Sequence, residues 1–278
     1  MQINYCCPYW GSEKDKPADF IDKVLSSGYD GIEVLLPAAS TPFTEAFLKK
    51  LSTVRETKPD FLLILQQLTA PENESVDSYI KKMSRSLMDL TDLKPGFINT
   101  HTGKDYYSFS DNCRVIEAAL NISHKTGVRI LHETHRGRFS FHAASLIPYL
   151  RQFPELELTG DFSHFCTVSE SLLEDQEDII GKIIPHVSHI HARVGHTQGP
   201  QVTDPFLPEW ETQLIRFESW WQQIINDKIK RGVQMMTITP EFGPAPYMPL
   251  APFTQEPLGN QWQINANMMQ RLRSKLAT

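Results

Sequence analysis

The sequence predicts a single (β/α)8 barrel, the α/β fold in which eight parallel strands alternate with eight helices. Short apolar runs alternate with longer segments of helical periodicity, and eight such pairs fill the 278 residues. Strands that alternate with helices favour parallel pairing with right-handed crossovers. No glycine- or serine-rich linker divides the chain. We therefore expect one domain over residues 1–278.

A doubly wound open sheet is the main alternative to a barrel. Such sheets usually carry a glycine-rich phosphate-binding loop directly after the first strand. The segment after the first apolar run reads PYWGSEKDK, and it contains neither GxGxxG nor GxxxxGK followed by Ser or Thr. The absence of both motifs favours the barrel.

Each expected strand is a short run rich in Ile, Val, Leu and Phe, which is typical of strands buried on both faces. In chain order the expected strands cover residues 2–7, 30–36, 61–67, 96–101, 128–134, 156–162, 187–193 and 234–241. The expected helices show apolar residues at helical spacing, and several end at a glycine suited to a C-cap, as at Gly28, Gly127 and Gly232. They cover residues 18–28, 44–54, 76–90, 112–127, 141–153, 170–184, 217–232 and 265–277.

Composition and charge narrow the possible partners. Hydrophobic residues make up 40% of the chain and charged residues 22%, which is ordinary for a globular protein with a sizeable core. A net charge of −6 disfavours nucleic acid, because phosphate binding needs a basic face. The N-terminal segment lacks a signal-peptide pattern, and no run approaches the roughly 18 apolar residues of a membrane span. We expect a cytoplasmic protein with no nucleic-acid or membrane partner and with four reduced cysteines that ligate no metal.

Four successive strands in the second half of the chain end in acidic or histidine side chains. These ends read ILHETH, GDFSH, SHIHARVGH and TPEFGP. The spacing in HETH differs from the His-Glu-x-x-His motif of zinc proteases, so that helical metal site is excluded. In a barrel the carboxyl ends of the strands carry the site, and the two-residue period of a strand decides which side chains point inward. The inward residues at these four ends are Glu133, Asp161, His191 and Glu241.

Three carboxylates that converge at one level of a barrel repel one another unless a positive charge lies among them. A divalent cation meets this need, and three carboxylates with one imidazole suit Mn²⁺, Mg²⁺, Co²⁺ or Zn²⁺. We predict that one such ion binds Glu133, Asp161, His191 and Glu241. Any one of these residues alone would more simply be salt-bridged or solvated. For His189, we expect packing in the core or support of the ligands.

These motifs resemble those of the xylose isomerase-like barrels, which include sugar epimerases, inosose dehydratases and AP endonucleases. The resemblance extends over the whole chain through the order of the eight units. It implies the same four metal ligands, and it implies that His164 and His101 face the substrate. Many barrels of this kind associate, so a homodimer or homotetramer is possible, and Trp220 and Trp221 give a weak hint of such an interface.

Two departures from the family pattern are informative. Similar ketose epimerases carry an arginine six residues after the metal histidine, where this chain has Thr197 and offers Arg193 instead. AP endonucleases carry an Asp-x-His motif after the seventh strand, where this chain has Asp204 followed by Pro205 and Phe206. The second departure, together with the acidic charge, argues against DNA repair.

The resemblance implies a metal-dependent isomerase or epimerase that moves a proton on a sugar or polyol through an enediolate. Glu133 and Glu241 are the candidate catalytic acid and base, because a carboxylate beside the reacting carbon can transfer the proton. The candidate substrate-binding residues are His101, His164, Arg193 and Gln67. An inosose-type dehydratase on the same site and a non-catalytic sugar-binding barrel remain open alternatives.

Some polar residues near the strand ends allow two interpretations. His135, Arg136 and Arg138 could reach an anionic group of the substrate, although a solvated loop is the simpler interpretation. Glu33 suits either a substrate contact or an ion pair with a basic residue, and Trp10 suits either stacking on a sugar or packing.

Overall fold

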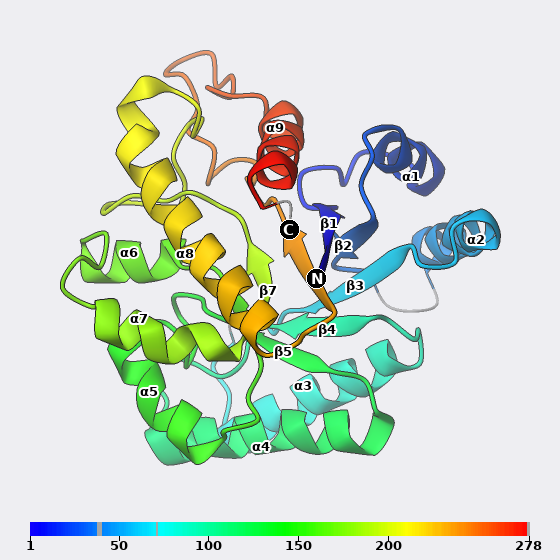
Figure 1. Ribbon diagram of the computed structural model, residues 1–278. Coiled ribbons are helices and arrows are strands. Elements are labelled where there is room, and N and C mark those ends of the chain that lie inside the picture. Colours follow the sequence, from blue (N-terminus) through cyan, green and yellow to red (C-terminus); the bar gives the residue numbers. More distant parts are fainter. Residues whose placement is uncertain (38–40, 71, 277–278) are drawn as a thin grey trace.

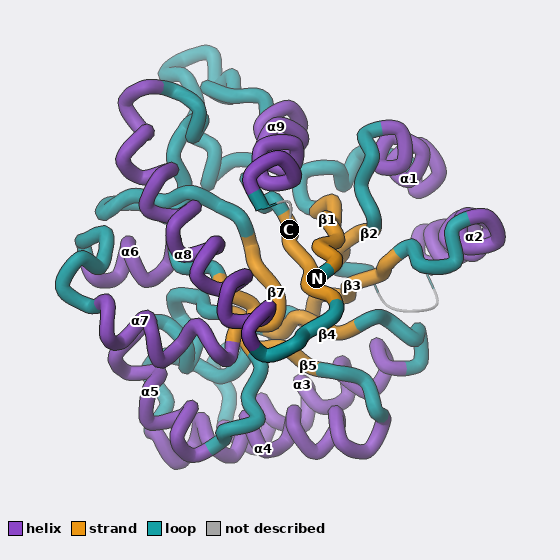
Figure 2. Tube along the Cα trace, viewed as in Figure 1, coloured by secondary structure: helices purple, strands orange, loops and turns teal. Residues whose placement is uncertain are grey.

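Eight parallel strands form one closed barrel in the computed structural model, which describes residues 1–37, 41–70 and 72–276. Figures 1 and 2 show the strands in the middle of the molecule and the helices around them. The strands are β1 (Gln2–Pro8), β2 (Gly31–Val34), β3 (Leu62–Gln67), β4 (Phe97–Thr100), β5 (Ile130–Glu133), β6 (Leu158–Gly160), β7 (Val187–His191) and β8 (Met235–Thr239). Each pairs with its sequence neighbours, and β1 pairs with β8. The predicted fold class is confirmed.

The helices follow the strands in the expected order, with one difference in the second half. They are α1 (Pro17–Ser26), α2 (Pro42–Thr57), α3 (Val76–Thr91), α4 (Phe109–Thr126), α5 (Ala143–Gln152), α6 (Ser163–Ser169), α7 (Glu177–Ile183), α8 (Glu211–Lys230) and α9 (Gln261–Lys275), with short 3-10 helices η1 (Ile184–His186) and η2 (Pro208–Trp210). The helix predicted over 170–184 is α7 alone, because Glu170 and Leu173 have positive φ angles of 49° and 57° that a helix cannot accommodate. The predicted end of the last helix, Ala277, lies outside the described residues.

Local sequence explains where several helices begin and end. The side chain of Thr41 accepts a hydrogen bond from the Thr44 amide at 3.2 Å and starts α2, and Ser108 caps α4 in the same way at 3.1 Å from the Asp111 amide. Such caps satisfy amides that have no partner inside the helix. Gly127 ends α4 with a φ of +72°, a conformation that glycine adopts without steric cost.

Every strand except β1 is shorter than the sequence predicts, and β6 and β8 matter most for the site. β6 ends at Gly160 and β8 ends at Thr239, so that Asp161 and Glu241 lie just beyond the ladder, whereas Glu133 and His191 are the last residues of their strands. All four positions remain at the carboxyl end of the barrel. The difference is within the usual uncertainty of element ends, and it does not change the level at which the side chains project.

The barrel has an apolar layer inside it and a larger core outside it. Cys6, Ile64, Phe97 and Leu131 form the inner cluster. The outer core lies between the strands and the helices and includes Trp220 and Trp221 on α8. Because Leu131 belongs to the inner cluster, Glu133 points inward as well, as the strand period predicts.

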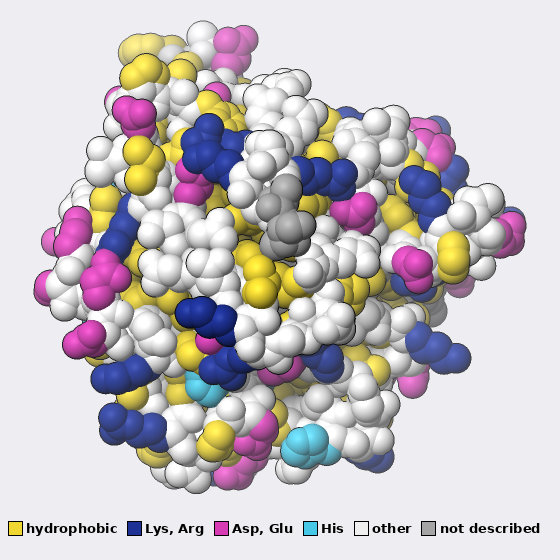
Figure 3. All heavy atoms as spheres, in the orientation of Figure 1, with side chains coloured by type: hydrophobic (Ala, Val, Ile, Leu, Met, Phe, Trp, Pro, Cys, Tyr) yellow, Lys and Arg dark blue, Asp and Glu magenta, His cyan; other side chains and the backbone are white. Residues whose placement is uncertain are grey.

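None of the helices in the described residues combines the length and the hydropathy needed to cross a bilayer. On the face shown in Figure 3, acidic and basic side chains are interspersed. Among the local pairs, Arg271 and Lys275 on α9 both bind Glu218 on α8, at 2.5 and 2.6 Å.

The paired tryptophans of α8 are barrel packing and give no hint of a subunit interface. Trp220 is 0% exposed and Trp221 is 1% exposed, and Trp220 packs against Phe162 and Phe217.

We predict that Trp221→Ala lowers the free energy of unfolding by about 3–5 kcal/mol, because it leaves a large cavity in the outer core. Urea unfolding followed by circular dichroism measures this change. Ile215→Ala on the same helix is the control, since Ile215 is 56% exposed and its loss should cost less than about 0.5 kcal/mol. Equal effects of the two substitutions would contradict this account of the packing.

Candidate active site

Four side chains from the ends of β5, β6, β7 and β8 meet at the carboxyl end of the barrel. One ligand atom from each lies within 4.8 Å of the ligand atoms of the other three, and all four residues are buried. The residues are Glu133, Asp161, His191 and Glu241. This buried cluster could hold a metal ion, and its carboxylate-rich composition suits the divalent ions named above.

The two ring nitrogens of His191 face different partners. Nε2 lies 3.0 Å from Oε1 of Glu33, and Nδ1 lies 2.9 Å from Oε2 of Glu241 and 3.7 Å from Oε1 of Glu133. Nδ1 is buried and has no well-aligned hydrogen bond within the described chain. A proton on Nε2, donated to Glu33, leaves the Nδ1 lone pair directed at the carboxylates. The donor set therefore fits a metal ion, with Glu33 in the position of the carboxylate that orients a metal-binding histidine.

Glu33, on β2, is the centre of a polar network whose partners come from other strands of the barrel. Its carboxylate accepts hydrogen bonds from Thr239 at 2.6 Å and Asn99 at 3.2 Å, and it lies 3.1 Å from Nε2 of His189. It is an ion-pair and hydrogen-bond partner of histidines rather than of a lysine or arginine. Its 1% exposure leaves it little access to a substrate. His189 takes the supporting position that we expected for it.

Arg193 is a cation inside the carboxylate cluster. Its side chain is only 2% exposed, and its guanidinium binds Asp161 and lies 2.9 Å from Glu241. The guanidinium also lies 4.8 Å from the centre of the Tyr247 ring and 5.7 Å from that of Trp10. Arg193 thus supplies part of the positive charge that the carboxylates require, and it is positioned by two aromatic rings.

The cluster nevertheless keeps an excess of acidic groups. Four buried carboxylates, including Glu33, lie around one permanent cation, Arg193, and around histidines that are charged only when protonated. Buried carboxylates in excess of their cations are strongly unfavourable. A divalent ion coordinated by the cluster would relieve this excess.

Burial and neighbouring charges give these groups different pKa values. Burial opposes the ionisation of Glu133, but His101 and His191 outweigh it and hold the pKa of Glu133 well below its usual value. Burial raises the pKa of Glu241, and His191 and Arg193 only partly offset this effect. For His191, burial lowers the pKa, but Glu241, Glu33 and Glu133 together raise it well above its usual value.

Three histidines line up beside Glu133. The rings of His101 and His135 lie 4.3 Å apart, and those of His135 and His164 lie 3.9 Å apart. His101 is the nearest of the three to the acid, with Nε2 at 3.1 Å from Oε2 of Glu133. His164 is fully buried and neither ring nitrogen has a hydrogen-bond partner in the described residues. Burial lowers the pKa of both His135 and His164, so both are neutral near pH 7.

The residues at the ends of β3 and β4 differ from the sequence expectation in detail. Gln67 is buried and bonds to Thr69 and Thr100, at 3.1 and 2.6 Å. Its neighbour Gln66 instead faces the site and lies 3.2 Å from Glu33. Asn99, which the sequence analysis did not single out, donates to Glu133 at 2.8 Å. Side chains alternate between the two faces of a strand, and Asn99 lies two residues before His101. This alternation is the signal that could have identified Asn99 and Gln66.

A pocket of 350 Å³ opens above this cluster, and we call it the mouth pocket. Its lining comprises Tyr9, Trp10, Glu13, Leu35, Gln66, Leu68, His101, Glu133, His135, Arg193, Glu241 and Tyr247. Two of the three carboxylates of the cluster, Glu133 and Glu241, therefore face a space that a small molecule can enter. Aromatic rings and a few convergent polar groups are typical of such a binding site.

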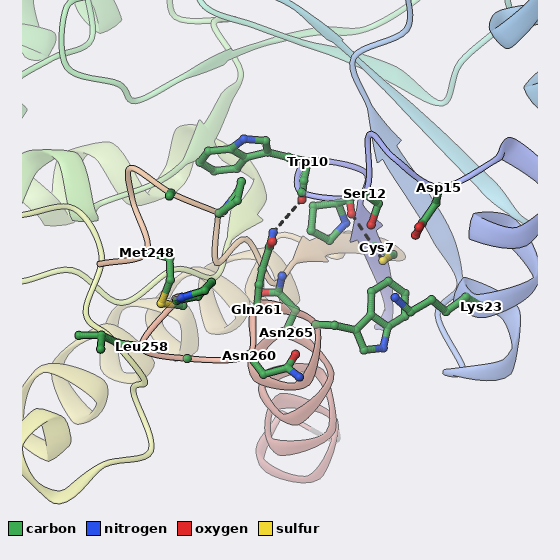
Figure 4. Close-up of a pocket in the computed structure, with 17 residues that line it drawn as sticks. Cys7, Trp10, Ser12, Asp15, Lys23, Met248, Leu258, Asn260, Gln261 and Asn265 are labelled. Carbon is green, nitrogen blue, oxygen red and sulfur yellow. Dashed lines mark hydrogen bonds between the residues drawn. The ribbon is translucent and has the colours of Figure 1, made fainter. Parts of the chain in front are cut away.

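A larger cavity of 690 Å³ lies to one side of the barrel mouth, against the start of α9 (Figure 4). Its charged lining residues in the described chain are Asp15 and Lys23. Gln261 spans it and donates to the carbonyl of Trp10 at 2.7 Å. Because this cavity has no cluster of acids and histidines, the mouth pocket is the better candidate despite its smaller volume. Trp10 lines both spaces, and its ring also packs against Tyr247.

Comparison with solved structures identifies the class of barrel. The chain resembles a xylose isomerase domain-containing protein from Salmonella typhimurium LT2, with a TM-score of 0.60 and 13% identity over 99% of this chain and 97% of that one. It also resembles the IOLI protein, whose structure contains a bound zinc atom, with a TM-score of 0.63 and 11% identity over 98% of each chain. A probable 3-DHS dehydratase, AsbF, involved in petrobactin synthesis in Bacillus anthracis, matches with a TM-score of 0.61 and 15% identity over 98% of each chain. These similarities show that the chain shares the TIM-barrel fold of these proteins.

Comparisons by sequence, in contrast to those by structure, find no related protein. No protein-family model matches this chain, and no curated protein matches it. The structural likeness therefore establishes the fold, whereas activity has to be argued from the site.

We predict that the purified protein binds one divalent ion per chain and that Glu33→Gln weakens this binding about 10- to 100-fold, because the variant no longer holds the charged partner of His191. Titration calorimetry with Mn²⁺ and Zn²⁺ measures the affinity. Asp30→Asn is the control, since Asp30 is an acid at the opposite end of β2 that pairs with Arg273. Unchanged metal affinity in Glu33→Gln would remove Glu33 from the support of the site.

Proposed function

We propose that this barrel is a divalent-metal-dependent isomerase or epimerase that transfers a proton on a small sugar or polyol substrate through an enediolate. The observation that carries the proposal is the pair of carboxylates, Glu133 and Glu241, that line the mouth pocket together with histidines and an arginine. A divalent ion held by Glu133, Asp161, His191 and Glu241 would supply Lewis-acid stabilisation of the negative charge that develops on substrate oxygen.

Glu133 and Glu241 approach the pocket from well-separated strands. Glu133 ends β5, and Glu241 follows β8, which lies three strands further around the closed barrel. One carboxylate can then remove a proton from a substrate carbon while the other returns a proton from a different side, which inverts the centre. A single carboxylate that shuttles the proton between adjacent carbons would interconvert an aldose and a ketose.

Other residues of the pocket orient the substrate. His101 lies beside Glu133 and can donate to a hydroxyl oxygen, and Arg193 can use its Nη1, which has no partner within the described chain. Trp10 and Tyr247 offer aromatic faces next to Arg193. His164, which the sequence analysis expected to face the substrate, is fully buried and does not line the mouth pocket, so in this proposal it acts only through its contact with His135. These roles, and the ligand roles of the four cluster residues, are part of the proposal.

The proposal predicts that Glu133→Gln and Glu241→Gln each reduce solvent deuterium incorporation into a substrate sugar at least about 100-fold, because each removes a proton-transfer group. Mass spectrometry of sugars incubated with metal-loaded protein in D₂O measures the exchange. Glu13→Gln is the control, because Glu13 lines the same pocket but lies outside the metal-binding cluster. Exchange at the wild-type rate in both cluster variants would remove these two residues from the chemistry.

A dehydratase on the same site is the second candidate. The observation that favours it is the fold shared with the probable 3-DHS dehydratase. The enediolate would then expel a hydroxyl group from the adjacent carbon as water. A conjugated product that absorbs in the ultraviolet distinguishes this reaction from isomerisation, and its absence across inososes and related keto-acids counts against the dehydratase. A sugar-binding barrel without catalysis would bind such compounds and turn over none of them.

The cytoplasmic location, the single domain and a homodimer or homotetramer remain predictions.

A further inference from the structure

Next to the mouth pocket is a second hollow whose charge is mainly positive. This rim cavity has a volume of 680 Å³ and lies between the loop after β4 and the loop after β5. Its basic lining residues are Lys104, Arg136 and Arg138. His135 lines the mouth pocket and the next residue, Arg136, lines the rim cavity, so the two spaces are adjacent.

The loop after β4 is built to hold Lys104 in a fixed position. The Asn112 side chain accepts from the Lys104 amide at 3.2 Å and donates to the Lys104 carbonyl at 2.9 Å. Gly103 has a φ of +63°, and a Cβ atom there would lie 2.2 Å from Oδ1 of Asn112. Only glycine therefore permits this clamp, since any side chain would displace the asparagine.

The loop after β5 is tied to the same structure. The amide of Phe139 donates to the carbonyl of Thr102 at 3.3 Å, and the amide of Arg138 donates to the carbonyl of His135 at 3.2 Å. These bonds hold the backbone of both loops, and Lys104 and Arg138 line the same cavity.

None of the three cations has a carboxylate partner within 4.0 Å in the part of the chain that the structure describes. Lys104 is only 4% exposed, and its Nζ lies 5.4 Å from the centre of the Tyr79 ring, without a hydrogen-bond acceptor among the described residues. Arg138 has a buried Nε that also has no partner there. Two acids line the cavity, Glu72 and Asp105, and Glu72 is bound by Lys82.

A buried cation without a counter-ion is costly unless a ligand supplies the missing charge. Burial lowers the pKa of Lys104 and the charge of Arg138 lowers it further, while Glu74 and Asp105 offset part of this effect. A bound dianion would relieve the repulsion between these groups. Lysine and arginine together are well suited to phosphate, which accepts several charge-assisted hydrogen bonds.

We propose that the rim cavity is an anion subsite that binds the phosphate group of the substrate through Lys104 and Arg138, with Arg136 between this group and the mouth pocket. Arg136 lies 5.3 Å from the centre of the Tyr247 ring, and Tyr247 lines the mouth pocket. A sugar phosphate could then reach both spaces at once. The substrate part of this inference rests on the proposed function, whereas the existence of an anion site does not.

The test is titration calorimetry of inorganic phosphate into the full chain at constant ionic strength. We expect one phosphate per chain for the wild-type protein, and at least about tenfold weaker binding for Lys104→Met and for Arg138→Gln, because each loses a charge-assisted hydrogen bond. Lys125→Met is the matched control, since it removes the same charge from the exposed far end of α4 and should leave the affinity unchanged. Circular dichroism verifies folding, and Arg138→Gln decides alone if Lys104→Met does not fold.

Several results would overturn the inference. The first is the absence of saturable phosphate binding, and the second is equal affinity of the wild-type protein and the folded variants for phosphate. The third is displacement of phosphate by acetate at equal concentration, because that result would exclude a site for a dianion. We expect Glu133→Gln to bind phosphate as the wild-type protein does. A wild-type protein that binds phosphate but exchanges no sugar proton would refute the proposed function and leave the anion site in place. If the protein exchanges a proton of a sugar phosphate, inorganic phosphate should raise the KM for that substrate without lowering kcat. If inorganic phosphate does not compete, the rim cavity does not bind the phosphate group of the substrate.

Discussion

The site depends on one electrostatic constraint, which is that carboxylates crowded inside a barrel must be matched by positive charge. Glu33, Glu133, Asp161 and Glu241 are all buried at the carboxyl end of the strands. Arg193 and His191 match part of their charge, and hydrogen bonds from neutral groups such as Asn99 and Thr239 satisfy further oxygens. The remaining acidic excess is what makes the cluster suitable for a divalent ion.

The layers of the barrel interior strengthen this constraint. The inner apolar cluster around Phe97 and Leu131 fills the barrel next to the polar groups and keeps water out from that side. The charges therefore interact in a medium of low polarity, in which both attraction and repulsion are stronger than in water. Glu133 and Glu241 nevertheless line the mouth pocket, where a substrate can enter. The proposed chemistry and the charge balance thus depend on the same few residues.

Sequence reasoning succeeded where a strand's own geometry decides the outcome. The two-residue period of β5 and β7 predicts that Glu133 and His191 point into the barrel, and the order of the eight units predicts the closed topology. It was less successful with Glu33 and Gln66. Glu33 meets His189 and His191 across the barrel, 156 and 158 residues away along the chain. Local periodicity gives the face of a strand but not the partner that lies on the far side of the barrel.

The sequence by itself determined the fold class, the level of the site and the convergence of Glu133, Asp161, His191 and Glu241, because these follow from the alternation of elements and of side chains. Only the tertiary structure decided that Arg193 enters the cluster, that three histidines lie in a row beside Glu133, and that Lys104 and Arg138 line one cavity. Those arrangements depend on how separate loops pack together. No local pattern encodes such distances, because each is set by contacts between residues that are distant along the chain.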